Sequence, residues 1–254
     1  MSPDAPVLVV SDLHLDREPS PTFEQFLAFL DGPARTAAAL YILGDLFEYW
    51  IGDDARFPAA EALAGVLARL PLPVTFQHGN RDFLLDTEYA GRAGMRIAPE
   101  ELRIPLPCGP ALLMHGDSLC TADVDYLRFR EVVRKPDWRQ SFLARPLPER
   151  IAEAERLRAA SRDAGRQKAR DITDVHPDAV AEVLRAHGVS LLIHGHTHRP
   201  AIHRLQVDGR PCLRCVLPAW DERPGYLTVD AHGPRLLALD GQDYLPEAGH
   251  YSPA

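Results

Sequence analysis

The sequence predicts a mixed α/β sandwich, because strand-like and helical segments alternate before a run of hairpins. In the first part, the apolar runs PVLVVS, ALYILG and LPVTFQHGN are separated by helical patterns such as TFEQFLAFL and PAAEALAGVLARL. Two further strand-like runs are PALLMHG and VSLLIHG. Later, AIHRLQV and CLRCVL flank Asp208-Gly209, which predicts a hairpin, and GYLTV and RLLAL predict two more strands.

Composition indicates a soluble globular protein of one large domain, or a domain with one insertion. The chain has 254 residues, of which 46% are hydrophobic and 25% charged. No apolar run is long enough to span a bilayer, and the start lacks the basic residues of a signal peptide. The four cysteines form no disulfide framework, and the C-x-x-C pair Cys212 and Cys215 is interpreted as strand packing. Cytoplasmic residence is therefore expected.

The net charge of −8 is unevenly distributed along the chain. Residues 126–170 hold 13 Lys/Arg and 6 Asp/Glu, a balance of +7, which leaves 15 basic and 30 acidic residues elsewhere, a balance of −15. This basic segment is helical by pattern and carries apolar residues between its arginines. We therefore predict a core formed by residues 1–121 and 171–254, with a helical insertion at 122–170.

Five strand-like runs end in side chains that can bind a metal. These are Asp12 with His14, then Asp45, then Asn80, then His115, and finally the triplet His194, His196 and His198. Each lies beside a small or turn-forming residue, in SDLH, GDLFE, GNRD, HGDS and GHTH. Any one of these could be an ordinary capped turn. Because α/β folds place functional groups at strand ends, five such ends together favour a shared site.

The types of side chain narrow the choice of metal. Two carboxylates, one amide oxygen and several imidazoles form a mixed set that suits Mn, Fe, Zn, Co or Ni. No cysteine takes part, which argues against a structural zinc site. Seven candidate ligands are too many for one tetrahedral ion, and they suit two ions that share a bridging carboxylate.

The order of these motifs, D-x-H, GD, GN, H and GHxH, resembles the calcineurin-like metallophosphoesterases over residues 12–198. The resemblance implies a four-layer α/β/β/α sandwich. It also implies two metal sites that share Asp45: Asp12, His14, Asp45 and His198 hold one ion, and Asp45, Asn80, His115 and His196 hold the other. His194 has no ligand role in that pattern and is interpreted as a packing or supporting residue.

Arg81 is a departure from many members of that superfamily, which carry a histidine after the asparagine. Arginine stays protonated, so it cannot be a general acid, but it can bind phosphate oxygens and stabilise charge. This favours a leaving group that departs as an anion, as in a pyrophosphate. Two alternatives remain open: His78 or His203 could supply a proton, and Arg81 could form a simple ion pair with Asp82.

A closer resemblance rests on LGDLFEYWIGDD, HGNRDFLL, MHGDSLCTAD and IHGHTHRP, which look like the UDP-2,3-diacylglucosamine pyrophosphatases of lipid A biosynthesis. It implies hydrolysis at the α-phosphorus to UMP and 2,3-diacylglucosamine 1-phosphate, with two Mn²⁺ ions. Asn80 and Arg81 would be the catalytic residues. Substrate contacts would come from Asn80, Arg81, Asp123, Ser161, Lys168 and His196. Gly165 stands where the family often has an amide or hydroxyl side chain, so that contact is in doubt.

The insertion then acquires a predicted role as a lid over the acyl chains. Phe129, Phe142, Leu147 and Leu157 would line a cavity, while arginines face the nucleotide or anionic lipid. We expect a monomer that lies peripherally on the cytoplasmic face of the inner membrane and binds no nucleic acid. The alternatives are a solvated helical pair packed on the core, another dinuclear phosphodiesterase or nucleotide pyrophosphatase, and a non-catalytic scaffold. A scaffold would typically have lost ligands, and here all seven remain.

Overall fold

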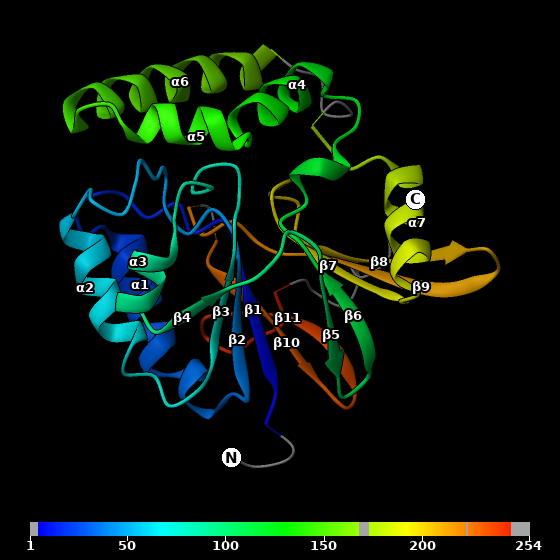
Figure 1. The fold of residues 1–254 in the computed structure, drawn as a ribbon. Helices are drawn as coiled ribbons and strands as arrows, with labels where there is room; N and C mark the ends of the chain where they lie inside the picture. Colours follow the sequence, from blue (N-terminus) through cyan, green and yellow to red (C-terminus); the bar gives the residue numbers. More distant parts are fainter. Residues whose placement is uncertain (1–4, 168–172, 222, 245–254) are drawn as a thin grey trace.

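The structure is a computed structural model that describes the backbone of residues 5–167, 173–221 and 223–244, and the side chains of these ranges except 160–167. Two β-sheets pack face to face, with helices on both outer faces (Figure 1). The predicted four-layer α/β/β/α sandwich is confirmed. No helix in the described ranges is long and apolar enough to cross a membrane.

The first sheet has six strands in the order β11-β10-β1-β2-β3-β4. Strands β1 to β4 run parallel, whereas β10 is antiparallel to both β1 and β11. Their bounds are β1 Val7–Val10, β2 Ala39–Leu43, β3 Val74–Gln77, β4 Met95–Ile97, β10 Gly225–Asp230 and β11 Gly233–Ala238.

The second sheet has five strands in the order β5-β6-β7-β9-β8. Strands β6, β7 and β9 run parallel, and β5 and β8 are antiparallel edges. Their bounds are β5 Leu102–Leu106, β6 Gly109–Leu113, β7 Leu191–His194, β8 Ala201–Val207 and β9 Arg210–Val216. The predicted hairpin at Asp208-Gly209 joins β8 to β9, with φ of 51° and 74° at these two residues. Positive φ at both positions is typical of a tight hairpin turn.

Four helices cover the outer faces of the sandwich. Helices α1 (Pro21–Asp31), α2 (Pro58–Leu67) and α3 (Thr87–Arg92) lie on the first sheet, and α7 (Pro177–His187) lies beside the second (Figure 1). Two short 3-10 turns, η1 (Pro33–Thr36) and η2 (Asp117–Leu119), complete this part. Helix α1 begins where Ser20 accepts a hydrogen bond from the Phe23 N–H at 3.3 Å, with Pro21 at its first position.

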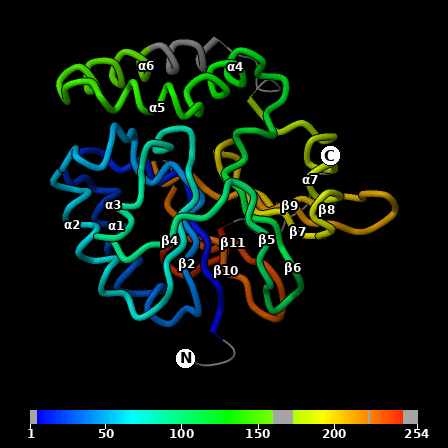
Figure 2. The backbone as a smooth tube through the Cα atoms, viewed as in Figure 1, coloured from blue at the N-terminus to red at the C-terminus, as the bar shows by residue number. Residues whose placement is uncertain are grey.

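Three helices fill most of the predicted insertion: α4 (Val124–Val133), α5 (Pro136–Leu143) and α6 (Leu147–Gln167). They lie across the end of the sandwich where β1, β2 and β3 finish, as the backbone trace also shows (Figures 1 and 2). Val133 and Phe142 are buried there and join the apolar core of the first sheet. The described part of the basic segment is therefore helical, as predicted, and contributes apolar side chains to the core.

The two cysteines of the C-x-x-C pair lie on β9 and are buried. Cys212 packs in the apolar cluster beneath α7, and Cys215 packs between the two sheets. Because they contribute to different clusters on opposite faces of one sheet, they do not form a joint metal site.

Candidate metal centre and active site

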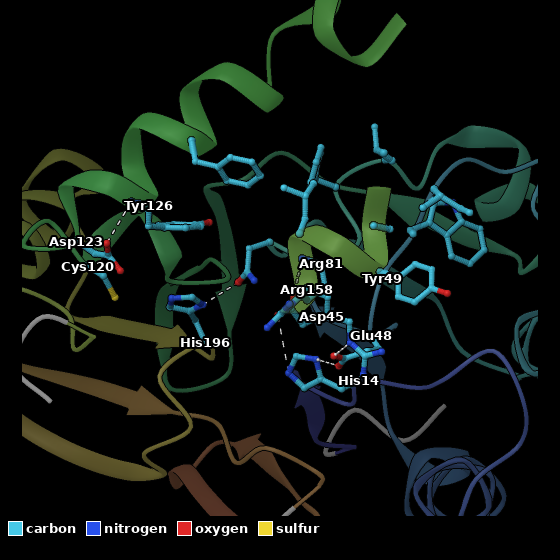
Figure 3. Close-up of a pocket in the computed structure, with 18 of the residues that line it drawn as sticks. His14, Asp45, Glu48, Tyr49, Arg81, Cys120, Asp123, Tyr126, Arg158 and His196 are labelled. Atoms are coloured by element: carbon cyan, nitrogen blue, oxygen red, sulfur yellow. Dashed lines mark hydrogen bonds and ion pairs between the residues drawn. The ribbon is translucent and has the colours of Figure 1, made fainter. Parts of the chain in front are cut away.

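The predicted ligand residues converge at one edge of the sandwich. Asp12 follows β1, Asp45 follows β2 and Asn80 follows β3, all at the carboxyl ends of parallel strands. His115 and His196 follow β6 and β7, which are parallel neighbours in the second sheet. The carboxyl ends of both sheets therefore deliver their side chains to the same place (Figure 3).

One group of donor atoms surrounds a carboxylate oxygen of Asp12. The Asp12 Oδ1 atom lies 3.4 Å from His198 Nε2 and 3.9 Å from His14 Nε2, and the two imidazole nitrogens are 3.3 Å apart. The other oxygen, Oδ2, accepts hydrogen bonds from Ser11 Oγ at 2.5 Å and from the His196 N–H at 2.9 Å. Oδ1 is buried, and besides the two imidazoles it meets no hydrogen-bond donor among the described residues. A buried carboxylate oxygen of this kind calls for a cation.

A second group of donor atoms surrounds Asn80. Its Oδ1 atom lies 2.9 Å from both His115 Nε2 and His196 Nδ1. His115 Nδ1 lies 2.8 Å from the Leu43 carbonyl, to which an N–H at this position donates, leaving the Nε2 lone pair free for a metal.

Asp45 lies between the two groups. Its Oδ2 atom is 3.9 Å from His14 Nε2 and 3.8 Å from His115 Nε2, while Oδ1 accepts the Arg81 N–H at 2.8 Å. Two sets of ligand atoms thus cluster closely enough to hold a metal ion, one from Asp12, His14 and His198 and the other from Asp12, Asp45 and His115. The buried, unpartnered oxygen and the mixed nitrogen and oxygen donors fit a divalent metal.

Backbone strain is concentrated at these residues. Five of the seven predicted ligands have positive φ, with values of 54° at Asp12, 49° at His14, 50° at Asp45, 67° at His196 and 53° at His198. Within the described ranges, the remaining non-glycine residue with positive φ belongs to the β8–β9 turn. Such conformations are unfavourable by about 1 kcal/mol each or more, and they cluster at functional sites.

Two motif glycines allow the loops to approach the carboxylates. A Cβ atom at Gly79 would lie 2.1 Å from Asp45 Oδ1, and one at Gly195 would lie 2.2 Å from Asp12 Oδ2. Any side chain at either position would displace the carboxylate. The glycines of the GN and GH motifs are therefore explained by packing against the two central carboxylates.

A pocket of about 620 Å³ opens over these residues. One wall carries His14, Asp45, Asn80, His196 and His198, and the opposite wall is contributed by the helical segment. The apolar lining includes Phe129, Trp138, Phe142 and Leu157, together with Ile51 and Leu84. Figure 3 shows His196, Tyr126 and Asp123 at one side and Tyr49 at the other, with Arg81 and Arg158 between them.

Arg81 lines this pocket, and its backbone is held on both sides by the Asp45 carboxylate and the Trp50 N–H. Asp82, the alternative partner considered for its guanidinium, is instead fully buried. Its carboxylate accepts the backbone N–H groups of Gly79 and Leu46, each at 2.8 Å. Burial and the neighbouring Asp45 raise the pKa of Asp82 to about 7. The side chain of Asp82 thus organises the loop rather than pairing with Arg81.

The two candidate proton donors lie outside the pocket lining. His78 Nε2 is 2.7 Å from the Leu85 carbonyl, and His203 lies on β8. His194 is fully buried, with Nδ1 2.9 Å from the Gly195 carbonyl, and it does not line the pocket either. Burial, reinforced by Arg214, lowers the pKa of His194 to about 3, so its ring is neutral.

Among the predicted substrate contacts, Asp123 lines the pocket and caps α4 by accepting the Tyr126 N–H at 3.1 Å. Asn80, Arg81 and His196 line it as well. Lys168 lies outside the described residues, and at Ser161 and Gly165 the structure describes only the helical backbone.

Sequence reasoning missed Glu48, which contacts His14 at the ring nitrogen that points away from the other predicted ligands. Its Oε2 atom lies 3.1 Å from His14 Nδ1, and its Oε1 atom accepts a hydrogen bond from Arg158 of α6. Burial would raise the pKa of Glu48, but the contacts with His14 and the charges of Arg81 and Arg158 lower it to about 2. The signal was available, because Glu48 belongs to the same GDLFE motif as Asp45.

Asp117 was also missed, although it stands two residues after His115. It is buried and accepts hydrogen bonds from the Tyr126 hydroxyl and from Arg130 Nε, the latter at 2.7 Å. Burial would raise the pKa of Asp117, but His115 and Arg130 hold it well below its usual range. Asp117 thus ties α4 to the loop that carries His115.

The comparisons with known proteins agree with this geometry. A family model described as calcineurin-like phosphoesterase matches residues 5–200. The curated relatives include the UDP-2,3-diacylglucosamine hydrolase of Stenotrophomonas maltophilia (strain K279a), 49% identical over 242 residues, with 91% of this chain and 98% of that protein covered. The enzyme of that name from Aromatoleum aromaticum is 50% identical over 237 residues, covering 92% and 97%. That from Cellvibrio japonicus is 48% identical over 239 residues, covering 93% and 98%.

The chain belongs to the calcineurin-like phosphoesterase family and, within it, to the family of the UDP-2,3-diacylglucosamine hydrolases. Both resemblances seen in the strand-end motifs are confirmed. Family membership and the clustered carboxylates and imidazoles together support a divalent metal cofactor.

Proposed function

We propose that this protein hydrolyses the pyrophosphate bond of UDP-2,3-diacylglucosamine at the α-phosphorus, giving UMP and 2,3-diacylglucosamine 1-phosphate in lipid A biosynthesis. The relatives of nearly full length carry the name UDP-2,3-diacylglucosamine hydrolase. The observation that carries the proposal is the pocket, in which a candidate metal centre and a large apolar cavity share one space. A substrate with a pyrophosphate beside two acyl chains requires that combination.

The metal cofactor in this proposal is a pair of Mn²⁺ ions. Asp12, His14 and His198 would hold one ion, Asn80, His115 and His196 the other, and Asp45 both. Two such ions, when bound, neutralise charge on the phosphate oxygens and lower the pKa of a water molecule.

Arg81 and the chemistry of the leaving group complete the reaction. Water forms a new bond to the α-phosphorus, and the bond from that phosphorus to the bridging oxygen breaks. The bridging oxygen leaves with 2,3-diacylglucosamine 1-phosphate as a phosphate anion, so no side chain has to protonate it. Arg81 and Asn80 bind the phosphate oxygens, and the guanidinium stabilises the charge that develops on them.

The helices α4, α5 and α6 act as a lid over the acyl chains in this proposal. Phe129, Trp138, Phe142 and Leu157 supply the apolar lining of the pocket from this side. Asp123 and His196 contact the substrate near the metal centre. Ser161 and Lys168 remain predicted contacts.

The outer surface of α4 is the proposed contact with the membrane. Val124, Arg128 and Val132 are spaced four residues apart, so they share one face of this helix. Val124 and Val132 are each 50% exposed, and the Arg128 side chain is 77% exposed. Apolar residues around an exposed cation suit the anionic cytoplasmic surface of the inner membrane, on which we place the protein as a peripheral monomer.

Hydrolysis in ¹⁸O-labelled water tests both the activity and the position of attack. The purified protein with Mn²⁺ and UDP-2,3-diacylglucosamine should release UMP that carries the label and unlabelled 2,3-diacylglucosamine 1-phosphate. Chelation of the metal should stop the reaction. Label in the lipid product would refute attack at the α-phosphorus, and equal rates on soluble dinucleotide pyrophosphates would favour a more general pyrophosphatase.

A further inference from the structure

A second cavity of about 250 Å³ adjoins the main pocket. The two share Thr197, which lies between the predicted ligands His196 and His198. The lining of the second cavity comes mainly from the loop after β7 and from the β8–β9 hairpin. This cavity therefore begins beside the candidate metal centre.

The position of this cavity relative to the helical segment matters for a long substrate. Helices α5 and α6, which carry Trp138, Phe142 and Leu157 of the apolar lining, lie over the first sheet, whereas β8 and β9 extend from the other side of the molecule (Figure 1). The predicted metal ligands lie between the two. A molecule with acyl chains at one end and a nucleoside at the other could place its pyrophosphate at the centre.

The hairpin turns four residues toward the second cavity. His203 pairs with Arg214 across the antiparallel strands, and Ala201 pairs with Val216. Side chains two apart on a strand point to the same face, so all four line the cavity together. Two of them are polar and two are apolar, as a site for an aromatic base requires.

Arg214 is a nearly buried polar group of this lining with an unused hydrogen-bond donor. Its side chain is 11% exposed, and its buried Nη1 atom donates no hydrogen bond within the described residues. The nearest carboxylate oxygen, Asp174 Oδ1, is 3.8 Å away, and the other oxygen of Asp174 binds Arg199 at 2.6 Å. The buried Thr197 hydroxyl likewise makes no hydrogen bond to any residue that the structure describes. Buried polar groups without partners are unfavourable, so a ligand with matching atoms would stabilise them.

We propose that this second cavity binds the uridine part of the nucleotide substrate. The inference rests on the function proposed above. Uracil presents two carbonyl acceptors and one N–H donor. Arg214 supplies donors, Asp174 supplies acceptors, and His203 can serve as either. Val216 and Ala201 contact the faces of the ring, while Thr197 lies at the entrance nearest the α-phosphate.

Product inhibition separates the nucleoside from a simple anion. For wild type and variants, the inhibition constants of UMP and of inorganic phosphate are measured against hydrolysis of UDP-2,3-diacylglucosamine. In Arg214→Gln the inhibition constant of UMP should rise by about tenfold or more, as expected for lost charge-assisted hydrogen bonds. The inhibition constant of phosphate should change by less than about twofold, because phosphate does not reach Arg214. Ala201→Leu fills the cavity and leaves the guanidinium unchanged. It should raise the inhibition constant of UMP in the same way.

Arg210→Gln is the matched control, because it removes the same charge from the same strand at an exposed position beside the hairpin turn. The inhibition constants of UMP and phosphate for this variant should equal those for wild type. Unchanged UMP inhibition in both cavity variants would overturn the inference, and so would an equal loss of phosphate inhibition, which would indicate a plain anion site. If wild type does not hydrolyse the substrate, the proposed function fails. Equilibrium dialysis of UMP with wild type and Arg214→Gln then still decides whether the cavity binds the nucleotide.

Discussion

Replacing Arg134 by alanine should remove the contacts that hold the end of α4 against the loop that carries Asn80 and Arg81. Arg134 Nη2 donates to the Gly79 carbonyl at 2.8 Å, and Nη1 lies 2.8 Å from Glu100 Oε1. The guanidinium also stacks over Phe83, 5.1 Å from the ring centre. One side chain of the helical segment thus holds the residue that directly precedes the predicted catalytic pair.

The expected loss of stability can be added from these three contacts. A hydrogen bond from a charged group to a partly buried carbonyl contributes about 1.5–3 kcal/mol. The Glu100 side chain is 49% exposed, so its ion pair contributes less than about 1 kcal/mol, and the ring contact adds about 0.5–1 kcal/mol. Together these give about 3 kcal/mol, which corresponds to a fall in Tm of about 6–12 °C for a domain of this size.

Activity should fall as well, because the Gly79 carbonyl fixes the loop beside the metal centre. A displacement of about 1 Å in a positioned group can lower the rate by about 10²-fold. Metal content, measured by mass spectrometry of the dialysed protein, should stay normal, since Arg134 contacts no predicted ligand side chain.

The matched control for this experiment is Arg128→Ala on the same helix. Its side chain is 77% exposed and its nearest carboxylate oxygen, on Asp125, is 3.9 Å away, so the change in stability should stay within about 0.5 kcal/mol. Thermal melting and kcat on UDP-2,3-diacylglucosamine are measured for both variants in neutral detergent micelles, where the proposed contact of Arg128 with anionic lipid plays no part. If Arg134→Ala melts and turns over like Arg128→Ala, the clamp on Gly79 is not significant.

Four further predictions test the site, at Asp45, Arg81 and Glu48 and in the helical segment. Asp45→Ala should abolish turnover and lower the metal content, because this carboxylate serves both donor groups; near-normal activity with one bound metal would refute the two-metal assignment. Arg81→Ala should lower the rate by about 10²-fold or more with metal content unchanged, whereas wild-type kinetics would leave the guanidinium without a role in the reaction. Glu48→Ala should weaken metal binding by about 10–100-fold through loss of the contact behind His14, as measured by metal titration, and Glu48→Gln should recover part of it. Replacing residues 126–170 by a Gly/Ser linker should remove activity on the diacylated substrate and should lower hydrolysis of a small phosphodiester to a lesser extent, because the acyl cavity is lost while the ligands lose only the supports from Arg130, Arg134 and Arg158; an equal loss of both with metal retained would mean that the segment only supports the fold.

The strands that carry the predicted ligands were predictable because each is a short apolar run followed by a candidate ligand beside a small or turn-forming residue. Each strand and the candidate ligand after it are adjacent in the sequence, so the motif can be recognised without knowing the fold. What the sequence could not supply is the strained backbone. Positive φ at Asp12 and Asp45 depends on hydrogen bonds between loops, such as Asp12 N–H to the Gly44 carbonyl at 3.2 Å.

The elements that were not predicted are short or irregular. Strand β4 has three residues and α3 has six, which is too few for a periodic pattern. Strand β5 contains Pro105, which weakens any strand assignment and is tolerated here because β5 is an edge strand. Helix α7 did carry a signal, since Val180 and Leu184 are buried four residues apart.

Part of the uneven charge of the chain is explained by ion pairs between the basic segment and the core. Five of its arginines pair with core carboxylates: Arg130 with Asp117 and Glu100, Arg134 with Glu100, Arg139 with Asp86, Arg150 with Asp54, and Arg158 with Glu48. These partners lie between 13 and 110 residues apart in the sequence, so no local pattern could reveal them.

Two of these pairs reach residues that support the metal centre. Arg158 binds the carboxylate that contacts His14, and Arg130 binds Asp117, two residues beyond His115. Moving the helices away from the core would therefore release a support on each of the two groups of predicted ligands. Because paired charges that are partly buried are screened only weakly by salt, this coupling should persist at ionic strengths that remove long-range attraction. The helical segment and the candidate metal centre are thus best regarded as one electrostatic unit, in which covering the pocket and orienting its ligands depend on the same contacts.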